Sequence, residues 1–199
     1  MRIYGDEQSG NCYKVQLLLS HLECDHEWIP IDILKGDTQT ADFLALNPNG
    51  KIPILQTDDG LVVTESNAIL HFLAHDTPYA PLDRLTHTRI LSWQFFEQYS
   101  HEPYIAVARF INRYLGMPAD RLDEFEDKQT GGNAALAVMN KHLQNHPYFV
   151  GDAMTIADIS LYAYTHVANE GGFDLTQYAA VNEWLKRVAS HPKHIPMNA

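Results

Sequence analysis

The 199-residue sequence has little cysteine, few basic side chains and no long hydrophobic run. Its two cysteines, Cys12 and Cys24, fit neither a disulfide framework nor the spacing of a structural zinc site, so a reducing cytoplasm is expected. Lysine and arginine number 14 against 25 acidic residues, and the formal charge of −11 argues against binding to nucleic acid or to an anionic membrane. No apolar run approaches the roughly 20 residues of a membrane span, so neither export nor anchoring is expected.

Histidine is plentiful, with eleven residues scattered along the chain. His71 and His75, and likewise His142 and His146, are spaced by four residues, which can place two imidazoles on one helix face for a metal. Neither pair has a third ligand or a metalloprotease-type glutamate nearby. We therefore expect surface histidines and no metal site.

The first part of the chain alternates short strands and helices. Strands are predicted over residues 1–5 and 28–33, and short helices after the turn at 6–11 and over 42–46. Two β-rich runs joined by an Asp-Asp-Gly turn predict a hairpin within residues 49–66, and the next helix follows directly. This order indicates an α/β unit, a mixed sheet covered by helices.

The rest of the chain reads as helical. Two prolines in residues 78–83 indicate a linker, which separates a domain of residues 1–77 from an all-helical domain of residues 84–199. Long helices are predicted over 84–115 and 120–145. Thr155 and Asp158 form a capping box that starts a buried helix ended by Gly171 and Gly172, and an amphipathic helix follows.

The hairpin and the helix after it suggest a binding site. Pro53 cannot donate to a strand ladder, so it must lie at an edge or at a strand start, and its peptide bond is a candidate for the cis form. Glu65 and Ser66 open a helix, and the N–H groups at a helix N-terminus bind anions. A small extended peptide could be held between the two. The alternative is an edge hairpin followed by an ordinary helix cap.

Five motifs stand in order along the chain: Ser9–Lys14, Asn47–Pro53, Glu65–Ile69, Gly151–Asp152 and Thr155–Asp158. Their conjunction resembles the glutathione S-transferase family over the whole chain, most closely bacterial members related to the theta, zeta and nu classes. The resemblance implies an N-terminal thioredoxin-like domain with a mixed four-stranded sheet, an all-α C-terminal domain and a homodimer. It also implies glutathione as co-substrate.

The resemblance implies roles for the residues around Pro53. The backbone of Ile52 would pair with the cysteinyl unit of glutathione, and Glu65 and Ser66 would meet its γ-glutamyl end. Lys51 would help to hold the other end. Theta-like chains often carry histidine where Thr38 stands here, which leaves the glycyl carboxylate without an assigned partner other than Lys35.

Ser9 and Asn11 are the expected catalytic residues. A thiol has a pKa of about 8.5, so the site must stabilise the thiolate. The Ser9 hydroxyl, in the turn before the first helix, could donate a hydrogen bond to the sulfur, and the helix dipole would help. In nu-like relatives the position of Asn11 contributes. Three rivals are Cys12, by a mixed disulfide, and the phenols of Tyr4 and Tyr13.

The second substrate, a small and hydrophobic electrophile, is expected against the helical domain, and the mixture of aromatic and charged candidate residues there leaves open an electrophile that bears a carboxylate. Candidate pocket residues, grouped by position in the first long helix, are Tyr99, His101, Glu102, Tyr104 and Arg109. The leading hypothesis is conjugation of glutathione to this electrophile. The alternatives are glutathione-dependent reduction of a disulfide or peroxide, a zeta-like isomerase, which Asn11 disfavours because that class carries cysteine there, and a non-catalytic binding or assembly protein.

Overall fold

The computed structural model describes residues 1–197, and within them the chain forms two compact units. The first unit holds Met1–Thr77 together with the chain from Lys193 on, and the second is Pro78–Pro192. Sheet and helix segregate between the units as the sequence predicted, with all four strands in the first. No helix among the described residues is long and apolar enough to cross a membrane.

A mixed four-stranded sheet forms the centre of the first unit. Its strands are β1 (Arg2–Gly5), β2 (Glu27–Pro30), β3 (Ile54–Gln56) and β4 (Val62–Thr64), in the order β2-β1-β3-β4. The β1 and β2 strands pair in parallel, whereas β3 pairs antiparallel with both β1 and β4. The fold class expected from the sequence is therefore confirmed.

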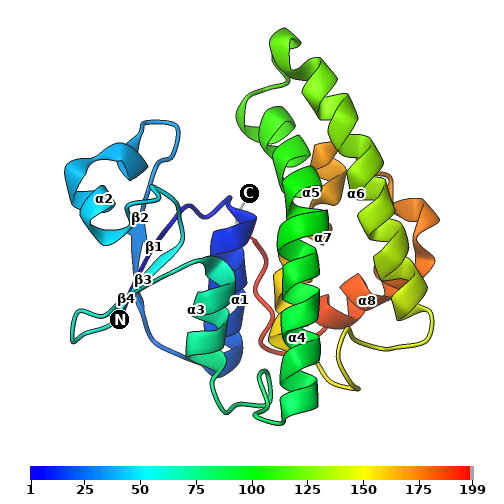
Figure 1. Cartoon of the computed structure of the whole chain (residues 1–199), viewed down its shortest axis with the longest axis horizontal. Helices are drawn as coiled ribbons and strands as arrows, with labels where there is room; N and C mark the ends of the chain where they lie inside the picture. Colours follow the sequence, from blue (N-terminus) through cyan, green and yellow to red (C-terminus); the bar gives the residue numbers. More distant parts are fainter. Residues whose placement is uncertain (198–199) are drawn as a thin grey trace. The chain divides into compact units, whose positions relative to one another are not determined.

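Helices cover both faces of this sheet. Helices α1 (Gly10–Leu22) and α3 (Ser66–Ala74) lie side by side (Figure 1). They share a core with the strands that contains Ile3, Val15, Leu19, Leu55 and Ile69. Because side chains alternate along a strand, Tyr4 faces the other side, where the short helix α2 (Ala41–Leu46) contributes Phe43. Burying such a side chain stabilises the fold by about 1.5–3 kcal/mol.

The second strand is shorter than the predicted span of 28–33. Ile31 still donates its N–H to the carbonyl of Gly5, at 2.9 Å. The Asp32 carboxylate then accepts hydrogen bonds from the N–H groups of Leu34 and Lys35. This side chain bonding turns the chain away from the sheet, so the strand cannot continue.

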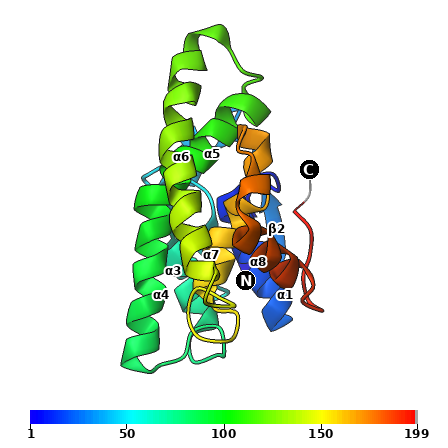
Figure 2. The ribbon, with the colours of Figure 1, turned by 90° about the vertical axis from the view of Figure 1, so that its right-hand side faces the viewer.

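The second unit is helical throughout, and Figure 2 shows the long α6 beside α5. Its helices are α4 (Arg84–Phe96), α5 (Glu102–Arg109), α6 (Leu122–Leu143), α7 (Ile156–Thr165) and α8 (Ala179–Ala189). The predicted helix over 84–115 exists, but π-helical turns interrupt it at Glu97–His101 and Phe110–Tyr114. Pro103 has no N–H, so the α-helical pattern cannot continue through it, and Glu102 donates to Glu97 five residues back.

Helix α7 is the buried centre of the second unit. Its predicted capping box is present, with Thr155 and Asp158 bonded reciprocally, and all ten helical residues are buried. The expected end at Gly171–Gly172 is wrong, because α7 stops at Thr165, whose hydroxyl donates to the carbonyl of Leu161 at 2.6 Å. The two glycines instead close a separate short 3-10 turn, Ala168–Gly171, where Gly172 takes φ of 85°.

Residues 193–197 belong to the unit that contains the sheet, whereas the sequence analysis expected the helical domain to span 84–199. Tyr13 of α1 donates its hydroxyl to the carbonyl of Ile195 at 2.7 Å. Ser20 of the same helix donates to the carbonyl of Lys193 at 2.8 Å. These hydrogen bonds hold the segment against α1, a contact that the periodicity of the last helix could not predict.

Candidate functional site

The candidate site lies at one end of the sheet of the first unit. Tyr4 pairs with Ile54 at the last position of the β1–β3 ladder. The turn that leads into α1 and the loop that ends at Pro53 therefore emerge at the same end. Helices α1 and α3 both start here too, and the side chains of Ser66 and Asn11 connect their first turns at 3.1 Å. Two helix N-termini and one extended segment thus converge.

Ser9 is the N-cap of α1. Its Oγ accepts a hydrogen bond from the N–H of Cys12 at 3.4 Å, while its own N–H donates to the carbonyl of Asp6 at 3.1 Å. A hydroxyl that accepts from the helix keeps its proton for a donor bond to another group. At the positive end of α1, this donor would favour an anion. The predicted turn position of Ser9 is therefore observed.

Cys12 is unsuited to act as a nucleophile. Its side chain is fully buried, and burial raises the pKa of the Cys12 thiol to about 12. The packing is close, because a Cβ on Gly5 would lie 2.9 Å from the Cys12 sulfur. A protonated and enclosed thiol cannot attack a disulfide.

The two rival phenols have other contacts. Tyr4 donates its hydroxyl to Oε1 of Gln56 at 3.0 Å, across two paired strands. Tyr13 is buried in α1 and donates to the carbonyl of Ile195. Neither tyrosine is at the N-cap where Ser9 lies, so the Ser9 hydroxyl is the side chain best placed for an anion at this helix start.

The segment before β3 is shaped by a cis peptide bond between Ile52 and Pro53. Ile52 precedes the ladder, so its backbone groups have no strand partner within the sheet. Asn47 donates its amide to the carbonyl of Lys51 at 2.7 Å, which holds the loop in place. The Lys51 side chain is exposed. The arrangement presents an extended edge to which a peptide can bind by strand-like hydrogen bonds.

Gly50 in this loop is required by its backbone conformation and by space. Its φ is 61°, a region that side-chain-bearing residues rarely adopt. A Cβ there would also lie 2.7 Å from Nε2 of Gln39. The tight packing of the loop fixes the approach to Pro53.

Glu65 occupies a strained position immediately before α3. It is the N-cap residue with φ of 67°, although it is not a glycine, and its side chain is exposed. Such conformations cost on the order of 1 kcal/mol or more and cluster at binding sites. The strain presents the Glu65 carboxylate next to the N–H groups at the start of α3, a pair suited to an ammonium and a carboxylate on one ligand.

A buried lysine, missed at the level of sequence, joins the two helix starts. The Lys14 side chain is 0% exposed, and its Nζ lies 3.4 Å from Oγ of Ser66. The Ser66 hydroxyl in turn donates to Oδ1 of Asn11 at 3.1 Å. The available signal was its position four residues before Leu18, on the apolar face of the first helix, where a cation is unusual.

The two residues considered as partners of a glycyl carboxylate, Lys35 and Thr38, differ in burial and in their contacts. Lys35 is exposed and pairs with Asp32 at 2.8 Å. Thr38 is buried, and its Oγ1 accepts a hydrogen bond from Gln39 at 3.2 Å. These contacts do not identify either side chain as a partner for the glycyl carboxylate at the sheet end.

The residues predicted for a second substrate do not share one environment in the second unit. Tyr99 is 85% exposed, whereas His101 and Arg109 are buried. His101 is hydrogen-bonded to Thr165 at 2.9 Å, and Arg109 pairs with Glu170 at 2.7 Å. Tyr104 is half-buried with Lys128 over its ring. Their assignment to an electrophile, together with that of half-buried Glu102, stays a prediction.

Residues 1–197 hold no group of three or more side chains arranged to bind a metal ion. The rings of His142 and His146 stack with centroids 4.2 Å apart. Burial and the neighbouring His146 lower the pKa of His142. The expected placement of both histidines on one helix is wrong, because α6 ends at Leu143 and His146 lies in the segment that follows, where its ring packs back on His142.

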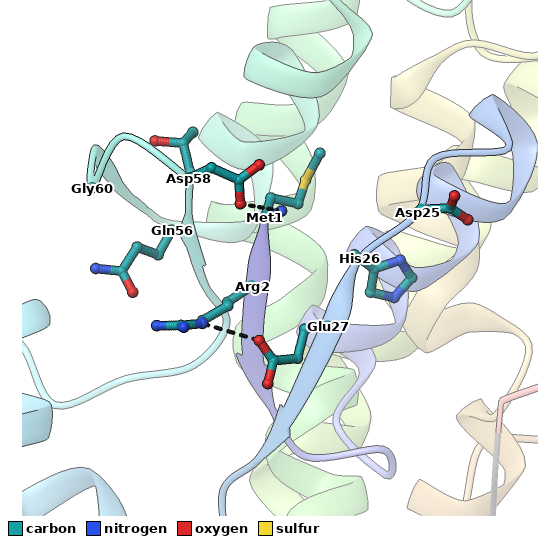
Figure 3. A pocket seen from close by; sticks show the side chains of 9 residues that line it. Met1, Arg2, Asp25, His26, Glu27, Gln56, Asp58 and Gly60 are labelled. Atoms are coloured by element: carbon teal, nitrogen blue, oxygen red, sulfur yellow. Dashed lines mark hydrogen bonds and ion pairs between the residues drawn. The ribbon is translucent and has the colours of Figure 1, made fainter.

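A hollow of about 650 Å³ lies at the opposite end of the strands (Figure 3). Its lining includes Arg2 and Gln56, which pair at the far end of the β1–β3 ladder. Two ion pairs lie within this lining, Met1 with Asp58 at 2.8 Å and Arg2 with Glu27 at 3.0 Å. Because the Met1 ammonium and the Arg2 guanidinium are each paired with a carboxylate, they do not form a shared binding site for a ligand. The site at the Ser9 end of the sheet therefore remains the candidate.

A thioredoxin-like unit with two helix starts beside a cis-proline, followed by a helical unit, defines the class of protein. Residues 8–76 match the family model of the glutathione S-transferase N-terminal domain, and residues 93–192 match that of the C-terminal domain. The chain therefore belongs to the glutathione S-transferase family, as its motifs predicted.

Three relatives show the range within this family. A solved glutathione S-transferase from Pseudomonas fluorescens is 56% identical, with a TM-score of 0.98 over 100% of this chain and 98% of that one. A disulfide-bond oxidoreductase, YfcG of Escherichia coli, is 30% identical over 92% of this chain and 87% of its own. A maleylacetoacetate isomerase from Methylobacterium extorquens, solved with bound malonate and glutathione, is 25% identical, with a TM-score of 0.82 over 97% and 94%.

Proposed function

We propose that this protein is a glutathione transferase that conjugates the glutathione thiolate to a small, hydrophobic electrophile. The tripeptide lies along the edge at Ile52, with its cysteinyl backbone paired to the groups that precede Pro53. Its γ-glutamyl ammonium meets Glu65, its γ-glutamyl carboxylate meets the N–H groups at Ser66, and Lys51 holds the glycyl end. The bound glutathione named for the isomerase relative supports this ligand.

The Ser9 hydroxyl donates a hydrogen bond to the sulfur and so stabilises the thiolate, with the Asn11 amide assisting. The thiol proton passes to water, because a serine hydroxyl is too weak a base to take it. The sulfur lone pair then forms a bond to an electrophilic carbon of the second substrate. In a substitution the leaving group departs with its electron pair, and in an addition the carbanion takes a proton from water.

The N-cap geometry of Ser9 is the observation that carries this proposal. We expect Ser9→Ala to raise the pKa of bound glutathione and to lower kcat/KM for a model aryl halide by 10- to 1000-fold, with less effect on glutathione affinity. An ultraviolet titration of the thiolate band measures the first quantity. Ser9→Thr, which keeps the hydroxyl, is the matched control. Failure of the wild type to bind glutathione at millimolar concentration would refute the proposal.

A second candidate is glutathione-dependent disulfide reduction, which the E. coli oxidoreductase and Asn11 favour. Two glutathione thiols would be oxidised to one glutathione disulfide while the substrate disulfide gains two electrons and two protons. Because Cys12 is buried as a thiol, the bound glutathione itself would attack the substrate. Steady-state assays with a small disulfide and with an aryl halide, on the same preparation, decide between the two reactions.

We infer that two copies of the chain assemble through the exposed face of α4 in the second unit. Leu85 and Phe95 of α4 are 58% and 68% exposed, and Tyr99, four residues after Phe95 in the π-helical turn Glu97–His101, is 85% exposed. Aromatic side chains with this exposure are typical of interfaces. The free thiols of Cys12 and Cys24 fit a protein of the reducing cytoplasm.

A further inference from the structure

Lys14 is a cation at a position where burial is costly. Its side chain is 0% exposed, in the first half of α1, between Tyr13 and Val15, which are equally buried. Removing an ammonium from water carries a penalty that only specific hydrogen bonds or charges offset. The contact of Lys14 Nζ with Ser66 Oγ at 3.4 Å shows which direction this charge faces, toward the start of α3.

The chemistry of the Lys14 ammonium, the Ser66 hydroxyl and the Asn11 carboxamide sets the direction of their hydrogen bonds. An ammonium only donates, so Ser66 Oγ accepts from Lys14 and offers its own proton onward. The amide oxygen Oδ1 of Asn11 accepts this hydrogen bond from the Ser66 hydroxyl at 3.1 Å. Since oxygen and nitrogen occupy opposite ends of the carboxamide, the NH2 group of Asn11 is then turned away from Ser66.

We propose that Lys14 is a positioning residue which, through Ser66, holds the Asn11 carboxamide with its NH2 group directed to the glutathione sulfur. This inference rests on the proposed function. The relay connects the starts of both helices at the site, because Asn11 is the second residue of α1 and Ser66 is the first residue of α3. With the Ser66 hydroxyl proton committed to Asn11, the γ-glutamyl carboxylate meets the backbone N–H of Ser66.

The proposal predicts that the pKa of the bound thiol depends on Lys14, which a role of Lys14 in packing alone would not produce. In this proposal Lys14 acts on the sulfur only through Ser66 and Asn11, and its loss removes the group that orients Ser66. The hydroxyl then rotates, and the Asn11 amide loses its fixed orientation. A purely structural lysine would affect the stability of the unit and leave the ionisation of a bound thiol unchanged.

The experiment is the ultraviolet pH titration of glutathione bound to wild type, Lys14→Met, Asn11→Ala and the double variant. We expect Lys14→Met and Asn11→Ala each to raise the bound-thiol pKa by about one unit, and the double variant to raise it no further, because both remove one donor. Lys14→Arg should restore most of the shift. Arg2→Met removes a charge at the far end of the sheet and should leave the titration unchanged.

An unshifted titration in folded Lys14→Met, or additive shifts in the double variant, would overturn the inference. If Lys14→Met does not fold, Ser66→Ala interrupts the same relay and should match Asn11→Ala in bound-thiol pKa. Asn11→Asp adds a further check, because it keeps the acceptor for Ser66 and loses the donor, so the pKa should rise. A wild type that binds no glutathione instead refutes the proposed function itself.

Discussion

At the scale of single residues, the polarity of each hydrogen bond decides what the site can do. Ser9 accepts from the helix that it caps and so retains its proton, which suits it to stabilise an anion. Oδ1 of Asn11 accepts a hydrogen bond from the Ser66 hydroxyl. Cys12, one turn into the same helix, is enclosed and stays a thiol. Ser9, Asn11 and Cys12, which lie within four residues of one another, thus differ in chemistry through their surroundings.

The first prediction at this scale concerns thiol reactivity. Because burial raises the pKa of Cys12 to about 12, iodoacetamide at pH 8 should alkylate half-buried Cys24 and leave Cys12 unmodified in the folded protein. Peptide mass spectrometry separates the two sites. In concentrated urea both should react, which serves as the control. Equal labelling rates under native conditions would contradict the assignment of Cys12 as a packing residue.

At the scale of elements, helix starts organise both units. In the first, α1 and α3 begin beside one another at the sheet end. In the second, the start of α7 is secured by Asp158, whose carboxylate accepts from the N–H groups of Thr155 and Phe149 and from the indole of Trp184. A fully buried carboxylate with these partners links the helix start to the preceding loop and to α8.

We predict that Asp158→Asn destabilises the protein at pH 7 by about 1–3 kcal/mol, because its amide presents N–H groups to donors. Burial raises the pKa of Asp158 from 3.8 to about 6. The folded state therefore binds this proton more tightly, so the contribution of Asp158 to stability is present below pH 4 and is lost as pH rises through 6.

Urea unfolding of wild type and Asp158→Asn between pH 4.5 and 7 measures this linkage. The advantage of the wild type should be greater at pH 4.5, with about 3 kcal/mol as the upper bound for a shift of this size. Asp152→Asn, in the exposed turn nearby, is the control and should show no such trend. An advantage of the wild type that grows with pH would contradict the assigned direction.

At the scale of the whole molecule, the α4 face bears on assembly. Leu85 and Phe95 of α4, and Tyr99 just after it, are large and exposed in a chain with a formal charge of −11. Water contact with such a face is unfavourable by about 25 cal/mol for each Å² of apolar area. Association of two copies would remove this contact.

We therefore predict that Phe95→Asp combined with Tyr99→Asp converts a dimer into a monomer. Light scattering coupled to size-exclusion chromatography reports the mass directly. Val138→Asp changes an exposed apolar side chain on α6, 48% exposed, and is the matched control that should leave the mass unchanged. A double variant that still elutes at twice the chain mass would place the interface elsewhere.

The sequence by itself determined the order of the elements, the mixed sheet, the capping box and the family, because periodicity, Pro53 and the motif spacing are local properties of the chain. Tertiary structure decided the rest. Only packing brings Lys14 and Asn11 to Ser66, across 52 and 55 residues of sequence, raises the pKa of Cys12, strains Glu65 and returns residues 193–197 to α1. These features depend on which surfaces meet in space, and local patterns do not encode that.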